Sequence, residues 1–124
     1  MTSHLATELR LRTTSRVLQV TFDSGDVFEL PFEYLRVFSP SAEVTGHGGG
    51  EGALVLGKQH VGISGVEPVG NYALRLFFDD GHNTGLYSWS VLHLLGRNRE
   101  ANWARYRERC AEAQLAAELK APKP

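Results

Sequence analysis

The feature that most constrains this chain is a strand–turn–strand–helix unit that occurs twice. Each copy has an alternating apolar segment, an Asp-x-Gly turn, a returning segment and a short helical pattern. In that order, these parts are residues 17–22, 23–26, 27–30 and 31–38 in the first copy, and 73–78, 79–82, 83–87 and 88–95 in the second. Alternation is typical of strands that bury one face. The chain is therefore predicted to contain two β-hairpins, each followed by a helix.

Individual positions of the two copies can be matched. The matched pairs are Val20 with Leu76, Phe22 with Phe78, Asp23 with Asp79, Gly25 with Gly81, and Leu30 with Leu86. Both turn glycines are expected to have positive φ, which glycine tolerates without steric cost. Pro31 suits the first turn of a helix, and Ser88 suits a helix N-cap.

The remaining segments extend this plan to one domain over residues 8–119, with loose ends at 1–7 and 120–124. Residues 8–13 are predicted to add an edge strand and residues 63–69 another strand. Gly96 is interpreted as a helix stop, after which Asn98 caps a long helix to about Leu119. An apolar stripe on that helix is predicted to pack on the core: Trp103, Tyr106, Cys110, Ala113 and Ala117. The predicted fold is α+β, a mostly antiparallel twisted sheet built from two hairpin–helix units, with the long C-terminal helix across it.

Charge and cysteine content exclude several functions. The chain has 13 Lys and Arg against 14 Asp and Glu, a net charge of −1, so no overall field attracts nucleic acid or a membrane. No apolar stretch approaches the thickness of a bilayer. The single cysteine, Cys110, forms no internal disulfide and no thiolate cluster. We expect a cytoplasmic protein without a cofactor, a nucleic-acid partner or a membrane partner, and the oligomeric state stays open.

Short motifs for chemistry are incomplete. Residues Gly52 to Lys58 match the start of a phosphate-binding loop, but Gln59 stands where a hydroxyl should hold magnesium. The five histidines have no metal-ligand spacing. No Gly-x-Ser-x-Gly nucleophile turn occurs. We therefore predict no catalytic residues.

Two segments are candidates for contact with a partner. The loop 45–52 has five glycines among its eight residues, with His47 and Glu51 as its ionisable groups; a flexible linker and a partner-binding loop are both open. Five arginines lie near the start of the last helix with few opposing charges: Arg97, Arg99, Arg105, Arg107 and Arg109. A solvated helix face is favoured over an RNA- or acid-binding surface. The candidate partner-binding residues are His47, Glu51, Arg99, Arg105 and Arg109.

Several longer segments together resemble a known family over roughly residues 8 to 110. They are Glu33-Tyr-Leu-Arg-Val-Phe-Ser-Pro-Ser-Ala-Glu-Val44, Glu67-Pro-Val-Gly-Asn-Tyr-Ala73, Phe78-Asp-Asp-Gly-His82 and Tyr87-Ser-Trp89. The chain resembles the N-terminal domain of γ-butyrobetaine hydroxylase-like dioxygenases, and more closely a stand-alone bacterial protein of unknown function that is built on this domain.

The resemblance implies a fold rather than an activity. In the hydroxylases the domain holds zinc through a Cys-Pro-Cys-x-x-Cys run and the histidine of Asp-Gly-His, and the matching positions here are Ser39, Ser41, Val44 and His82. Serine is a poor zinc ligand, valine is none, and one imidazole cannot hold the ion. We therefore expect a metal-free corner with His82 close to Ser39 or Ser41. The catalytic double-stranded β-helix domain of the dioxygenases is also absent from this sequence.

These observations favour a non-catalytic accessory or protein-interaction domain. A similar domain is attached to Mrp-type iron–sulfur carrier ATPases, so an auxiliary role in iron–sulfur or metal handling, acting through a partner, is the alternative. An enzyme would be a third reading, and it would need a cleft with convergent polar groups. Metal analysis of the purified protein separates the first two readings.

Overall fold

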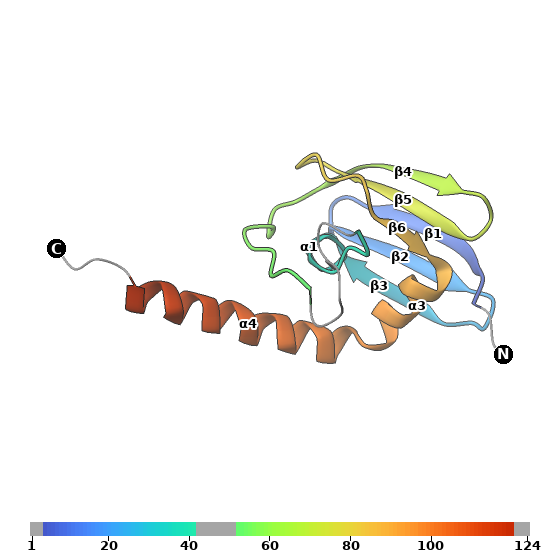
Figure 1. The fold of residues 1–124 in the computed structure, drawn as a ribbon. Coiled ribbons are helices and arrows are strands. Elements are labelled where there is room, and N and C mark those ends of the chain that lie inside the picture. Colours follow the sequence, from blue (N-terminus) through green and yellow to red (C-terminus); the bar gives the residue numbers. More distant parts are fainter. Residues whose placement is uncertain (1–3, 42–51, 121–124) are drawn as a thin grey trace.

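The computed structural model describes residues 4–41 and 52–120, whose fold is drawn in Figure 1. The elements run in the order β1 (Ala6–Arg12), β2 (Val17–Phe22), β3 (Val27–Pro31), α1 (Phe32–Val37), β4 (Ile63–Val69), β5 (Ala73–Phe78), β6 (Leu86–Ser88), α3 (Trp89–Arg97) and α4 (Arg99–Lys120). The predicted α+β class and the long C-terminal helix are confirmed. Val44, His47 and Glu51 lie outside the described residues.

The strands form two antiparallel sheets, ordered β1-β2-β3 and β4-β5-β6, where the sequence pattern predicted one. Each strand–turn–strand unit is preceded by a further strand, which is β1 in the first copy and β4 in the second. Each sheet therefore has three strands and is followed in sequence by a helix. One buried cluster joins both sheets with α1 and α3, and it includes Val20, Leu35, Leu76 and Leu92. The two sheets therefore share a single core.

The repeat includes these first strands. The β1–β2 ladder has a register shift between Ala6 and Glu8, and the β4–β5 ladder has one between Ile63 and Gly65. The turns also agree. Asp23 N donates to Leu5 O in the first copy, and Asp79 N donates to Gly62 O in the second, both at 2.9 Å. In the same way, Phe22 N donates to Asp26 O at 2.9 Å, and Phe78 N donates to His82 O at 3.0 Å. Gly25 has φ +93° and Gly81 has φ +90°, which confirms the predicted left-handed turn glycines.

The match of Leu30 with Leu86 is wrong by one residue. Leu18 pairs with Leu30 in the first sheet, and its counterpart Leu74 pairs with Tyr87 in the second. Leu30 and Tyr87 are both fully buried, whereas Leu86 is 40% exposed. The reason is one extra residue in the second copy, between the shared turn and β6, where the chain from 83 to 85 leaves the ladder.

The corrected register places Pro31 opposite Ser88 in the repeat, and both occupy the N-cap position of the following helix. Ser88 accepts a hydrogen bond from Val91 N at 3.1 Å, as its predicted capping role requires. Pro31 is the last residue of β3, and α1 begins at Phe32. The helix therefore starts one residue later than predicted. The same register makes Leu35 and Leu92 equivalent, and both are fully buried.

Gly96 is not a helix stop, because α3 continues to Arg97 and Asn98 is its C-cap. A Cβ atom at Gly96 would lie 2.3 Å from the ring carbon Cγ of Phe28. Glycine is therefore present because the helix lies directly against an aromatic ring. Asn98 then begins α4 through its carbonyl oxygen, which accepts from Asn102 N at 2.8 Å.

Gly96→Ala is expected to lower the free energy of unfolding by about 1 kcal/mol or more. Alanine gains about 1 kcal/mol of helix propensity, but overpacking against the Phe28 ring costs about 1–3 kcal/mol and the clash here involves the ring itself. Gly65→Ala is the control, since its Cβ would make only an ordinary contact at 3.5 Å and should not destabilise. Urea titration of both variants measures the difference. A Gly96→Ala protein as stable as the parent would contradict the close contact.

Two buried tyrosines connect the halves of the repeat. Tyr34 Oη, on α1, donates to Leu95 O of α3 at 2.7 Å. Tyr87 Oη, on β6, donates to Leu35 O of α1 at 2.6 Å. Both rings are at most 1% exposed. Each half therefore provides the hydrogen-bond acceptor for a buried hydroxyl of the other.

Helix α4 packs on the domain only through its first half. Tyr106 is buried and Trp103 packs against the core, whereas Cys110 and Ala113 are half-buried and Ala117 is exposed. The stripe predicted to cover the core is therefore only partly buried. The helix has 22 residues, about 33 Å, and its C-terminal part extends beyond the sheets (Figure 1). No helix among the described residues is long and apolar enough to cross a bilayer.

Candidate functional site

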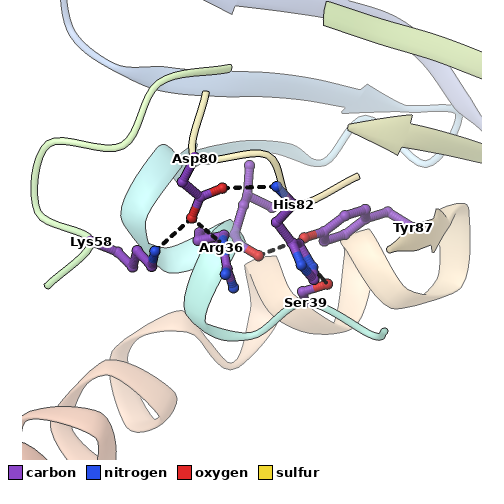
Figure 2. A network of polar contacts seen from close by, with 7 residues as sticks. Arg36, Ser39, Lys58, Asp80, His82 and Tyr87 are labelled. Atoms are coloured by element: carbon purple, nitrogen blue, oxygen red, sulfur yellow. Dashed lines mark hydrogen bonds and ion pairs between the residues drawn. The ribbon is translucent and has the colours of Figure 1, made fainter. Parts of the chain in front are cut away.

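A network of polar side chains surrounds Asp80 in the turn between β5 and β6 (Figure 2). One carboxylate oxygen of Asp80 lies 2.8 Å from Arg36 Nε of α1 and 2.7 Å from Lys58 Nζ. The other oxygen accepts from the backbone N of His82 at 3.0 Å. Burial by itself would raise the pKa of the Asp80 carboxyl, but the Lys58 ammonium, the His82 amide and the Arg36 guanidinium outweigh it and hold the pKa well below its usual range.

The expected closeness of His82 and Ser39 is present. Ser39 Oγ lies 2.9 Å from His82 Nε2, and both side chains are buried. Ser39 Oγ also accepts from Ser41 N at 3.3 Å, and Ser41 Oγ lies 2.7 Å from Thr84 Oγ1. Gly85 makes this possible, because a Cβ atom there would lie 2.4 Å from Ser39 Oγ.

The Ser39–His82 pair does not have the geometry of a nucleophile with its base. Ser39 is fully buried, so a substrate would have no access to its hydroxyl. Asp80 accepts from the backbone N of His82 rather than from its imidazole, so Asp80 does not take the place of the orienting acid of a triad. The pair instead connects the end of α1 to the β5–β6 turn, as Figure 2 shows.

As a metal site, this corner offers one imidazole donor among the residues the structure describes, His82. No group of three His, Cys, Asp or Glu side chains in residues 4–41 and 52–120 is arranged to hold a metal ion. Val44, the last of the four zinc-ligand positions implied by the resemblance, is outside the described residues. The absence of zinc stays a prediction.

The motif from Gly52 to Lys58 does not form a phosphate-binding loop. Residues 52–62 contain neither helix nor strand, whereas that loop must lead into a helix at its lysine. Lys58 instead forms the ion pair with Asp80. The structure therefore agrees with the rejection of this motif on sequence grounds, and gives Lys58 a place in the polar network instead.

The predicted partner-binding arginines are held by their own chain. Arg99 donates to Glu29 O, Arg105 pairs with Glu108 at 2.8 Å, and Arg109 donates to Gly52 O at 3.0 Å. Arg107, which was not among those candidates, is exposed and has no ion-pair or hydrogen-bond partner among the described residues. The sequence contained one signal for Arg107, because it follows Trp103 of the apolar stripe by one helical turn and so lies beside that stripe.

A groove of about 530 Å³ lies between α4 and the segment before β4. Its walls include Leu56, Trp103, Tyr106, Arg107, Ala113 and Ala117. Leu56 is 52% exposed. The rings of Trp103 and Tyr106 stack at 4.9 Å between centroids. Tyr106 is fixed by its hydroxyl, which donates to Val55 O at 2.7 Å.

The groove has few ionisable groups. Glu33 lies on the wall opposite α4, and burial raises its pKa above the ordinary value. Burial also raises the pKa of the Tyr106 phenol. Cys110 is half-buried in the wall. The lining is mainly apolar and aromatic, which suits the groove to covering an apolar surface.

Comparison with known proteins agrees with the fold. The model of the family described as "γ-butyrobetaine hydroxylase-like, N-terminal" matches residues 9–93. A crystal structure of a protein of unknown function of the DUF971 family from Acidithiobacillus ferrooxidans is 40% identical over 74% of this chain and 92% of its own, with a TM-score of 0.63. Two solution structures are 48% and 42% identical over 92% and 91% of this chain and 88% and 89% of theirs, with TM-scores of 0.79 and 0.78. No curated protein matches the chain.

Proposed function

The chain belongs to the γ-butyrobetaine hydroxylase-like N-terminal family, and on that premise we propose that it is a non-catalytic domain that binds another protein through the groove beside α4. The observation that carries this proposal is the groove itself. It is open, and its walls combine an exposed leucine, Leu56, with stacked aromatic rings and with Arg107, which has no charge partner in the described part of the chain. Aromatic residues and arginine are enriched at the centres of protein interfaces.

The polar network around Asp80 supports a structural role for that corner. Its charges satisfy one another, since two cations and one backbone amide bond a single carboxylate. Arg36 Nη1 is buried without a hydrogen-bond partner among the described residues, but the bonds to the Asp80 carboxylate still rigidify this part of the fold. The network connects α1, the segment before β4 and the β5–β6 turn. By this means it positions the segment that contains Leu56, and with it one wall of the groove.

A role in iron–sulfur or metal handling would need donors from the partner. The described residues provide no ligand cluster, and Cys110 is the only cysteine of the chain. In that case the captured partner would bring the metal, and metal analysis of the complex would detect it. Nothing in the geometry of the groove favours this alternative over a metal-free partner.

The test is a pair of arginine substitutions on adjacent residues of α4. Ala117 lines the groove and Ala116 does not, and both are exposed. We expect the tagged parent and Ala116→Arg to capture the same protein from native cytoplasm, and Ala117→Arg to bind that purified protein at least about tenfold more weakly, a loss of about 1.4 kcal/mol. Urea titration should show equal stability for the two variants. Equal binding by both would place the contact surface elsewhere.

A further inference from the structure

We propose that the groove receives helix α4 of a second copy of this chain, in antiparallel orientation, to form a symmetric dimer. The inference rests on the proposed function, in that it takes the groove as a protein-binding surface, and it names the occupant. Three observations support it: the spacing of the groove residues on α4, two opposite charges on one side of α4, and the acidic residue on the other wall of the groove.

The groove residues of α4 have the spacing of a helix that packs on another helix. They are Trp103, Tyr106, Arg107, Cys110, Ala113, Gln114 and Ala117, so the pattern of the first three recurs seven residues later. This is the heptad spacing of a helix–helix seam. The domain buries Tyr106 and half-buries Trp103, Cys110 and Ala113, whereas Gln114 and Ala117 are exposed where α4 extends beyond the sheets. The small side chains of Ala113 and Ala117 leave room for another helix to approach.

The charges along this seam are complementary when the helix meets its own copy. Arg107 has no partner among the residues described, and Glu118 contacts only the amide of Gln114, at 3.5 Å. The two lie eleven residues apart, about three turns, and therefore on the same side of α4. In an antiparallel pair, Arg107 of one copy lies beside Glu118 of the other. Two-fold symmetry makes this contact twice.

The opposite wall distinguishes a second copy from an acidic partner. Glu33 lines the groove there, and its pKa is already raised by burial. A strongly acidic helix would bring further negative charge against Glu33. A second copy instead brings one positive and one negative residue, as a self-complementary two-fold interface requires. The exposed Leu115 and Leu119 lie on the other side of α4 and are not part of this contact.

The experiment measures association by sedimentation velocity over a range of protein concentrations. We expect the parent to dimerise, and Arg107→Glu and Glu118→Arg each to raise the dissociation constant by about tenfold, because two attractive pairs become two repulsive pairs. An equimolar mixture of the two variants should recover the parent affinity, since both cross-pairs are again of opposite sign. Arg97→Glu is the matched control, because Arg97 is exposed and lies outside the groove. It should dimerise like the parent.

A parent that stays monomeric at every concentration, or a mixture that associates no better than either variant alone, would overturn the dimer. The proposed function fails separately. If the chain is monomeric but Ala117→Arg still loses the captured protein, the groove binds a different protein. A second outcome is that the two charge variants weaken the dimer as expected, but the parent and Ala117→Arg capture the same protein equally. In that case the groove serves self-association, and the other partner binds elsewhere.

Discussion

Replacing Leu35 with alanine is expected to lower the free energy of unfolding by about 2–5 kcal/mol, and replacing Leu92 with alanine is expected to do the same. Both side chains are fully buried in the cluster that joins the two sheets. Each substitution removes buried methyl groups and leaves a cavity that the surrounding strands cannot fill. The corrected register makes these residues counterparts, so a large effect at one predicts a large effect at the other.

Leu94→Ala is the control, since Leu94 lies on the same helix as Leu92 but is 58% exposed. Surface substitutions of this kind change stability by about 0.5 kcal/mol or less. Urea titration with a common slope for all three variants gives the comparison. A loss below about 1 kcal/mol at Leu35 or at Leu92 would contradict the shared core, since Leu→Ala at a buried site costs at least twice that.

Asp80→Asn is expected to lower the free energy of unfolding by about 2–3 kcal/mol at pH 7. The side chain keeps its shape but loses its charge, so Lys58 and Arg36 are left as neighbouring cations without their anion. The side chains of Asp80, Arg36 and Lys58 are 19%, 12% and 24% exposed, so solvent screens the loss only in part.

The effect of Asp80→Asn should disappear in acid. The pKa of Asp80 is lower in the folded chain than its ordinary value. Its contribution is therefore complete above the unfolded pKa of about 4, and is lost as the pH falls below that value towards the folded pKa. We expect parent and variant to differ most near neutral pH and to converge between about pH 4 and pH 2. Urea titrations across this range provide the measurement. A difference that stays constant with pH would mean that the Asp80 charge does not stabilise the fold.

Local patterns were sufficient to predict most of the elements. Alternation identified β2 and β5, and the Asp-x-Gly turns identified Gly25 and Gly81, because these signals depend on neighbouring residues only. The match of Leu30 with Leu86 failed because β6 has three residues, too few to show an alternation, and an extra residue precedes it. Gly96 was misinterpreted because its neighbour in space, Phe28, is 68 positions away in sequence.

The candidate site was less accessible from sequence. Closeness of Ser39 and His82 followed from the family resemblance and not from any local pattern. The contacts of Asp80 with Arg36 and Lys58 join segments 44 and 22 positions apart, and no periodicity reports such pairs. The groove was missed for a different reason. Its residues form a regular apolar stripe on α4, but the sequence does not say where the sheets end and the helix continues alone.

The reciprocal bonds of Tyr34 and Tyr87 have a consequence for folding cooperativity. Neither half of the repeat can satisfy its own buried hydroxyl, because Tyr34 donates to Leu95 O and Tyr87 to Leu35 O. Partial unfolding of one half would leave a buried polar group of the other without its partner, at a cost of about 1–3 kcal/mol. Although the chain is built from two similar units, it should therefore unfold as one, with amide exchange in both sheets governed by the same global opening.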